Sequence, residues 1–161
     1  DPQDFAGCRV GTALRRGKYL WLPLTRHGRP EGGLLLHLGM SGSLAFAEAP
    51  GAAGRHDHFD LVTSQGVLRL TDPRRFGAAV WSPALDRPPA STLLARLGPE
   101  PFDPALTAHT FHAGLRRRRT AVKAALLSGE LVVGAGNIYA CEALFDAGIE
   151  QGFAEIGRAH V

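Results

Sequence analysis

The sequence predicts an α+β protein in which a mostly β part is followed by a smaller helical part. Between residues 9 and 81, short apolar runs alternate with glycine-rich breaks, which is typical of the strands of a sandwich or a barrel. After a proline-rich stretch, apolar residues recur at helical spacing instead. The length of 161 residues, with 45% hydrophobic positions, suffices for one sizeable core or two small ones.

The strands and the domain boundary follow from the apolar runs and the prolines. Six prolines between residues 83 and 104 enclose only one short predicted helix, at 91–97. The predicted strands are 19–24, 33–38, 59–62, 67–70 and 78–81. The predicted domains are a β domain at 1–87, a linker at 88–103 and a helical domain at 104–154.

The helical part is predicted to begin at Asp103 and Pro104. An aspartate accepts hydrogen bonds at a helix N-terminus, and a proline loses none at the first helical position. Residues 120–127 form a second predicted helix, and a glycine turn at 134–137 precedes a third at 138–147. The apolar residues on one side of this third helix are Ile138, Cys141, Leu144 and Phe145.

Positive charge is concentrated in three segments, although the net charge is only +3. Basic groups that converge can bind a polyanion, because each neutralised phosphate releases condensed counterions. The other interpretation is that these segments are ordinary solvated faces. The three groups are Arg9, Arg15, Arg16 and Lys18; Arg69, Arg74 and Arg75; and residues 116–119 with Lys123.

Three loops carry residue types that suit nucleic-acid binding, each with a structural alternative. The glycines and helix-start amides at 134–137 suit a phosphate, or they form a purely structural turn. Met40, between two glycines, suits insertion into a base stack, or it packs within the protein. Arg74 and Phe76 suit an orphaned base and its neighbours; alternatively, an arginine pairs with Asp72 and Phe76 lies in the core.

Several classes of protein are disfavoured by the sequence. It has no run of about 20 apolar residues to cross a bilayer, and its N-terminus lacks the pattern of a signal peptide. We therefore expect a cytoplasmic protein that acts away from membranes. Cys8 and Cys141 have no CxxC arrangement and cannot supply four zinc ligands by themselves. We expect reduced thiols and no metal in this chain.

Six ordered motifs are similar to those of the formamidopyrimidine-DNA glycosylase family of bacterial base-excision repair enzymes. They occur in the family's order and at about its spacing, over roughly residues 6–150. The resemblance implies a β-sandwich domain followed by a helix-two-turns-helix DNA-binding domain. The motifs are RGKYL (16–20), HLGMSGSL (37–44), HDHFD (56–60), TDPRRFG (71–77), LGPEP (97–101), and VGAGNIYA (133–140) with EALF (142–145).

The resemblance implies an enzyme that removes oxidised purines, namely 8-oxoguanine and formamidopyrimidines, from double-stranded DNA. In the family, the amine of an N-terminal proline attacks the sugar of a flipped-out nucleotide, releases the base and forms a Schiff base. β- and δ-elimination then cut the strand, so the enzyme is both a glycosylase and an AP lyase. We expect a monomer in the bacterial cytoplasm whose partner is damaged duplex DNA.

The resemblance also implies roles for individual residues. Lys18 matches the family's catalytic lysine, which serves in proton transfer and elimination. His56 and Arg118 match contacts to DNA. Lys123 and Asn137 match groups that bind the phosphates near the lesion.

Three further side chains match those that fill the gap left by the flipped base. The resemblance implies that Arg74 contacts DNA and faces the estranged base, and that Phe76 wedges beside it. Met40 enters the gap from the other loop. Methionine in one loop, with arginine and phenylalanine in another, is the family's pattern for oxidised purines rather than oxidised pyrimidines.

The chain departs from the family's pattern at both ends. The family opens with Pro-Glu-Leu-Pro-Glu, whereas Pro2 here follows Asp1 and so has a tertiary amide instead of a free amine. We expect an internal fragment that lacks the catalytic Pro and Glu and is inactive alone. We expect no cofactor in it, because the family's one zinc ion belongs to a four-cysteine hairpin beyond this segment. The tail at 155–161 is expected to be non-native sequence.

Two other functions stay open. A short non-catalytic paralogue would bind damaged DNA without cutting it, and its own start and stop signals would frame this segment. A non-DNA protein such as a ribosomal component could share only the helix-two-turns-helix element. RNA binding through that element leaves Met40 and Phe76 without a role.

Overall fold

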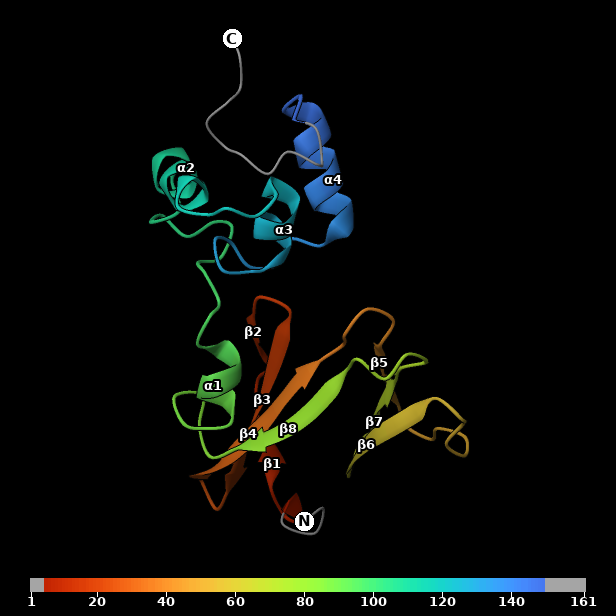
Figure 1. Ribbon diagram of the computed structural model, residues 1–161. Coiled ribbons are helices and arrows are strands. Elements are labelled where there is room, and N and C mark those ends of the chain that lie inside the picture. Colours follow the sequence, from red (N-terminus) through yellow and green to blue (C-terminus); the bar gives the residue numbers. More distant parts are fainter. Residues whose placement is uncertain (1–4, 150–161) are drawn as a thin grey trace. The chain divides into compact units, whose positions relative to one another are not determined.

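The computed structural model describes residues 5–149, so Pro2 and the tail at 155–161 lie outside the described residues. The chain divides into two compact units, Asp1–Leu93 and Leu94–Val161. Strands dominate the first unit and helices the second (Figure 1). The predicted α+β fold is thereby confirmed.

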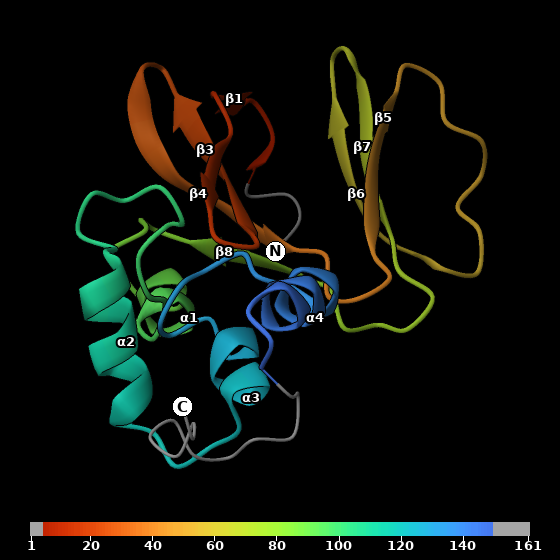
Figure 2. The same cartoon turned by 90° about the horizontal axis from the view of Figure 1, so that it is seen from above.

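The first unit contains two antiparallel sheets. The larger sheet has the order β1-β3-β4-β8, with β2 also paired to β3, and the smaller sheet has the order β5-β7-β6. Figure 2 shows the sheets as two separate groups of strands. The larger sheet is formed by β1 (Arg9–Val10), β2 (Leu14–Arg16), β3 (Tyr19–Arg26), β4 (Arg29–His37) and β8 (Ala78–Ser82). The smaller sheet is formed by β5 (Ser43–Ala47), β6 (Asp57–Thr63) and β7 (Gly66–Thr71).

The core of the first unit lies between these sheets. Alternate residues of a strand point to one face, so a row of leucines in β3 and β4 faces the same way. Apolar side chains of the smaller sheet pack against this row, which makes the arrangement a sandwich, as predicted. The buried residues of the larger sheet are Leu22, Leu24, Leu34 and Leu36, and those packed on them from the smaller sheet are Leu44, Phe59, Leu61 and Leu68.

The sequence did not predict β1, β2 or β5. The strand β5 carries only two large apolar residues, Leu44 and Phe46, and the alternation is too short to distinguish it from a loop. Its partner β7 defines it, because Leu44 pairs with Leu70 and Phe46 with Leu68. The strands β1 and β2 are short segments that pair only with β3.

Two crossover loops connect the sheets and are joined by one carboxylate. The loop at 38–42 leads from β4 to β5, and the loop at 72–77 leads from β7 back to β8. Asp72, which is 1% exposed, accepts hydrogen bonds from Ser41 Oγ (2.6 Å), the Gly77 amide (2.7 Å) and the Arg74 amide (3.2 Å). These hydrogen bonds lower the pKa of Asp72 to about 2, and the bond from Ser41 has the largest effect.

Among its described residues, the second unit has three helices after α1 (Ala90–Leu94), the short helix that spans the boundary between the units. The three are α2 (Ala108–Arg116), α3 (Val122–Leu127) and α4 (Asn137–Asp146). Their common core is formed by Leu115, Val122, Ala125 and Leu144. Among the described residues, no helix combines the length and the hydropathy that a membrane span requires.

The predicted start of the first long helix at Asp103 is wrong. The Asp103 side chain accepts a hydrogen bond from the Ala105 amide, and its carbonyl accepts one from Leu106, so a single turn forms there. The helix begins after Thr107, whose hydroxyl accepts from the Thr110 amide while the Thr110 hydroxyl accepts from the Thr107 amide. This reciprocal pair is a capping box, with threonine in place of the usual Glu or Gln.

The remaining helices are close to their predicted positions: α1 and α3 are shorter than predicted, and α4 begins and ends one residue earlier. The helix predicted at 91–97 is α1, and that predicted at 120–127 is α3. In α4 the packed face is formed by Ala140 and Leu144, whereas Phe145 is 84% exposed. The predicted apolar side of this helix is therefore only partly buried.

Replacing a core leucine will test the sandwich. We expect Leu36→Ala to lower the free energy of unfolding by about 2–5 kcal/mol, because Leu36 is buried between the sheets and its loss leaves a cavity. The matched control is Leu14→Ala, a leucine that is 53% exposed, for which we expect a change within about 0.5 kcal/mol. Equal effects in urea denaturation would contradict this core.

The carboxylate of Asp72 predicts a specific loss of stability in acid. Its pKa is lower in the folded chain than the ordinary 3.8, so its contribution is complete above that value and disappears as the pH falls through about 2. We expect the stability difference between the chain and Asp72→Asn, measured by thermal unfolding, to shrink between these pH values. A difference that is constant with pH would contradict the assignment.

Candidate functional site

Met40 and Phe76 stand on the two crossover loops and are 74% and 57% exposed. The loops meet through their backbones: a Cβ atom added at Gly39 would lie 2.6 Å from the Phe76 carbonyl carbon and 2.8 Å from the Gly77 nitrogen. Gly39 also has a φ of +64°, which disfavours any other residue. The alternative interpretations, with Met40 packed inside the protein and Phe76 in the core, are therefore wrong.

Arg74 lies against Phe76 on the same loop. Its guanidinium carbon is 5.0 Å from the centre of the Phe76 ring, within the range of a cation–π interaction. It is the backbone amide of Arg74 that donates to Asp72, and the residue is exposed. Arg75 follows with a φ of +57°, an uncommon conformation for a residue with a side chain. The turn thus presents a cation and an aromatic ring together to solvent.

His56 is exposed and lies directly before β6, next to the same turn. Its carbonyl accepts a hydrogen bond from the Asp72 amide at 2.8 Å. The Asp72 carbonyl in turn lies 3.0 Å from His58 Nε2. These two contacts fix the start of β6 against the crossover loop that carries Arg74.

Lys18 occupies the two-residue turn between β2 and β3, where Arg16 pairs with Tyr19. His37 lies nearby at the end of β4: its burial, and secondarily the positive charge of Lys18, lower the pKa of His37 below 6.5. The rings of Tyr19 and His37 are 4.7 Å apart. His37 Nδ1 accepts a hydrogen bond from the Gly39 amide at 3.0 Å, so the neutral ring carries its proton on Nε2.

The sequence did not single out His37, which connects the Lys18 turn to the Met40 loop. The available signal was its position at the end of an apolar run and two residues before the loop glycine, within the motif HLGMSGSL. A histidine that ends a buried strand is usually only a packing residue. The electrostatic effect of Lys18 on it appears only in the folded chain.

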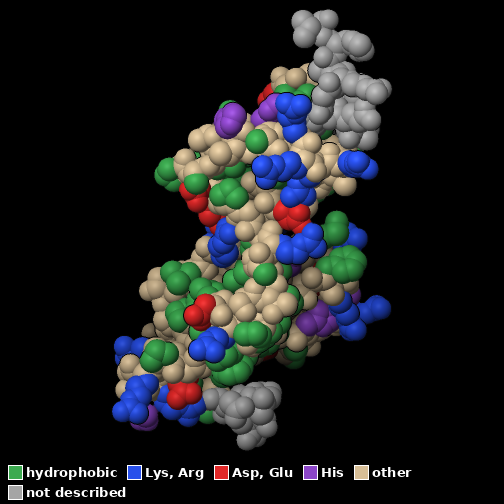
Figure 3. Space-filling model, turned by 60° about the vertical axis from the view of Figure 1, so that its left-hand side comes forward, with side chains coloured by type: hydrophobic (Ala, Val, Ile, Leu, Met, Phe, Trp, Pro, Cys, Tyr) green, Lys and Arg blue, Asp and Glu red, His purple; other side chains and the backbone are tan. Residues whose placement is uncertain are grey.

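The basic stretch at 116–119 ends α2 and follows it. Arg118 is the half-buried member, and its Nη1 lies 2.8 Å from Glu130 Oε2, while Arg96 also pairs with Glu130. The hydrogen bond from Arg118, more than any other interaction, lowers the pKa of Glu130. Figure 3 shows several Lys and Arg side chains on one face of this unit, with acidic side chains among them.

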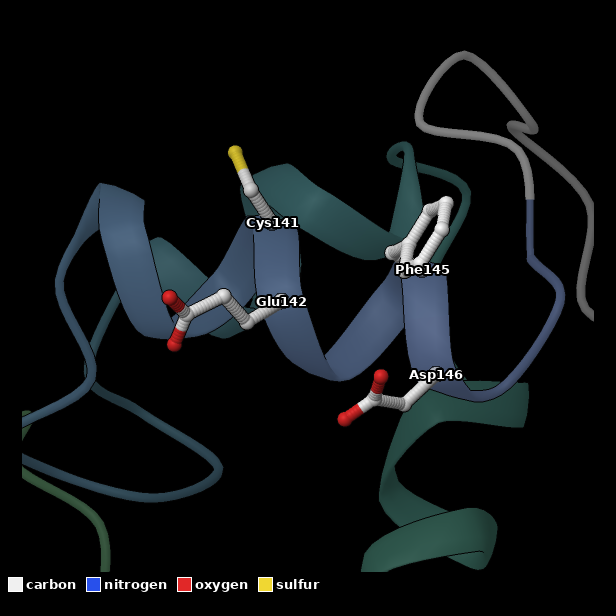
Figure 4. Close-up of a pocket in the computed structure, with 4 residues that line it drawn as sticks. All are labelled: Cys141, Glu142, Phe145 and Asp146. Atoms are coloured by element: carbon white, nitrogen blue, oxygen red, sulfur yellow. The ribbon is translucent and has the colours of Figure 1, made fainter.

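Asn137 is the first residue of α4 and is exposed. Its Oδ1 lies 3.8 Å from the sulfur of Cys141. Lys123 is half-buried in α3, the helix that packs against α4. Figure 4 shows a shallow depression on α4 lined by Cys141, Glu142, Phe145 and Asp146, all from this one helix. It contains none of the residues that the sequence predicted as a site.

The predicted site residues thus form two groups, one in each unit. The first unit gathers five of them around Asp72 and His37: Lys18, Met40, His56, Arg74 and Phe76. The second unit carries Arg118, Lys123 and Asn137. Within residues 5–149, no group of three or more His, Cys, Asp or Glu side chains is arranged to hold a metal ion.

Two family models match the chain. Residues 2–79 match the formamidopyrimidine-DNA glycosylase N-terminal domain, and residues 97–154 match the formamidopyrimidine-DNA glycosylase H2TH domain. A formamidopyrimidine-DNA glycosylase of Acidovorax sp. is 56% identical over 149 residues, which are 92% of this chain and 53% of the relative. The chain therefore spans about half the length of the curated relatives that it matches.

Solved structures agree with these matches. The MutM (Fpg) protein of Thermus thermophilus is 38% identical with a TM-score of 0.74, over 91% of this chain and 51% of that protein. A variant of the Lactococcus lactis Fpg protein, in complex with a Fapy-dG containing DNA, is 30% identical with a TM-score of 0.77, over 92% of this chain and 53% of that protein. Sequence and structure agree that the chain belongs to the formamidopyrimidine-DNA glycosylase family.

Proposed function

We propose that this chain is part of a bifunctional DNA glycosylase and AP lyase that removes oxidised purines, such as 8-oxoguanine and formamidopyrimidines, from double-stranded DNA. The activity is proposed for a longer protein, because the chain spans about half of its relatives. The observation that carries the proposal is the pair of exposed side chains Met40 and Phe76, with Arg74 over the ring, on interlocked loops.

Chemistry on a base requires that the nucleotide leave the stack, and the gap that remains must be filled. Met40 and Phe76 are apolar side chains without partners that would bury them, which suits insertion between bases. Arg74 offers a planar group of donors to the acceptor atoms of the base left without a partner. Its contact with the Phe76 ring keeps both groups at the same point of the loop.

The reaction itself needs a nucleophile and a group that moves protons. We assign the nucleophile to the N-terminal proline amine of the longer protein, which lies outside this chain. Lys18, an exposed residue of the turn beside His37, is suited to transfer protons at the sugar during elimination. The DNA contacts are assigned to His56, Arg74 and Arg118, and the phosphate contacts near the lesion to Lys123 and Asn137.

Further properties of the longer protein belong to the same proposal. One zinc ion is assigned to cysteines outside this chain, because Cys8 and Cys141 are too few for a four-cysteine site and lie in different units. The protein is expected to act as a monomer in the bacterial cytoplasm. Its partner is duplex DNA that contains oxidised bases.

The covalent intermediate provides the direct test of this function. The complete reading frame and the 161-residue chain are expressed in parallel and incubated with borohydride and a duplex that carries 8-oxoguanine opposite cytosine. We expect only the longer protein to be trapped, because the Schiff base forms on its proline. In that protein, Lys18→Ala should reduce trapping on the lesion while preserving binding.

Two results would overturn the proposal. If neither protein is trapped, yet both shift the duplex in a salt-sensitive manner, the chain belongs to a non-catalytic paralogue that binds damaged DNA. If neither binds duplex DNA at all, the assignment to DNA repair fails.

The role of Arg118 predicts a change in salt dependence. We expect Arg118→Ala to weaken duplex binding and to reduce the slope of log K against log[salt] by about 1, because one phosphate contact is lost. The control is Arg29→Ala, which removes the same charge from the exposed first residue of β4. Fluorescence anisotropy at several salt concentrations measures both, and identical slopes for the two variants would exclude a phosphate contact at Arg118.

A further inference from the structure

Both oxygens of the Asp72 carboxylate are engaged, and their donors come from different loops. Oδ1 accepts from Ser41 Oγ at 2.6 Å and from the Arg74 amide at 3.2 Å, and Oδ2 accepts from the Gly77 amide at 2.7 Å. Ser41 belongs to the loop of Met40, and the two amides belong to the loop of Phe76. The hydrogen bond from Ser41 is thus a side-chain bond that crosses from one loop to the other.

The same residue also holds a third segment through its backbone. Its amide donates to the His56 carbonyl, and its carbonyl lies 3.0 Å from His58 Nε2. Predicted site residues lie on four segments of the first unit: the Lys18 turn, the Met40 loop, the Arg74–Phe76 loop and the segment of His56. Asp72 contacts the last three of them. It is itself 1% exposed and has no access to DNA.

Rigidity matters to side chains that open a base stack. Unstacking costs a few kcal/mol per step, and any loop that must also become ordered on binding adds its own entropic cost. Hydrogen bonds to a carboxylate are about twice as strong as those between neutral groups. A buried carboxylate that already joins the loops removes the ordering cost before DNA arrives.

We propose that Asp72 is a positioning residue for gap filling: through Ser41 it locks the Met40 loop to the Arg74–Phe76 loop, so that the three side chains enter the duplex as one rigid wedge. The inference rests on the proposed function. It adds two residues, Asp72 and Ser41, that act without touching DNA.

Ser41→Ala is the sharpest test, because it removes the bond between the loops and leaves Asp72 with its two amide donors. Binding of the 161-residue chain is measured by anisotropy to an intact duplex and to one with a tetrahydrofuran abasic-site analogue. We expect the preference for the abasic duplex to fall by about three- to tenfold, the equivalent of one hydrogen bond, while intact-duplex affinity is unchanged. Ser43→Ala, an exposed serine at the start of β5, is the matched control and should keep the preference.

A second readout needs no DNA. Met40 is the one methionine of the chain, so methyl-labelled methionine gives a single NMR signal from the loop tip. We expect Ser41→Ala to lower the order parameter of this methyl group, and Ser41→Thr, which keeps the hydroxyl, to restore both the order parameter and the preference for the abasic duplex.

The possible results distinguish failure of the positioning role of Asp72 from failure of the proposed function. If the chain prefers the abasic duplex but Ser41→Ala changes neither that preference nor the methyl order, the positioning role of Asp72 is overturned. If the chain binds both duplexes equally while Ser41→Ala loosens the methyl group, the loops are locked but do not fill a gap, and the proposed function fails at this site. The proposal is supported if Ser41→Ala loses both the preference for the abasic duplex and the methyl order, while the control variants keep them.

Discussion

The buried carboxylate of Asp72 is the constraint on which the surface loops of the first unit depend. Ser41 and two backbone amides surround the charge, and a buried charge stripped of such donors is costly. The crossovers at 38–42 and 72–77 therefore stay together as long as Asp72 is ionised. The sheets fix the ends of the two loops, and the carboxylate fixes what lies between.

The second unit also contains a carboxylate that joins separate segments, but the groups involved are more exposed. Glu130 holds Arg118 and Arg96, but the Arg96 side chain is 85% exposed, so solvent screens that pair. Backbone bonds hold more firmly: Gly98 donates to the Gly129 carbonyl, and Val133 donates to the Pro99 carbonyl. The motif LGPEP thus has a structural role, because it anchors the segment that leads into the glycine turn before α4.

Local patterns were sufficient to predict some features and insufficient for others. The strands around Leu22 and Leu34 were predictable because each carries a long apolar run. The glycines around Met40 indicated a loop, but they left open whether its side chain is exposed or packed within the protein. The start of α2 at Thr107 was not predictable, because Asp103 and Pro104 also match a helix start and the capping box at Thr107 has a threonine where Glu or Gln is usual. His37 and Asp72 were missed as site residues for a related reason: their importance lies in partners distant in sequence, such as Ser41 for Asp72.

Met40, Arg74 and Phe76 lie on loops that cross between the two sheets, and this limits where the first unit can accept inserted residues. An extra residue at 38–42 or 72–77 would disturb the contact at Gly39, where backbone already meets backbone. The connection between β5 and β6 is largely exposed at 48–53, before the segment that carries His56, and it joins two strands of one sheet. Insertions, affinity tags or reporter groups should therefore be accepted there and rejected at the crossovers.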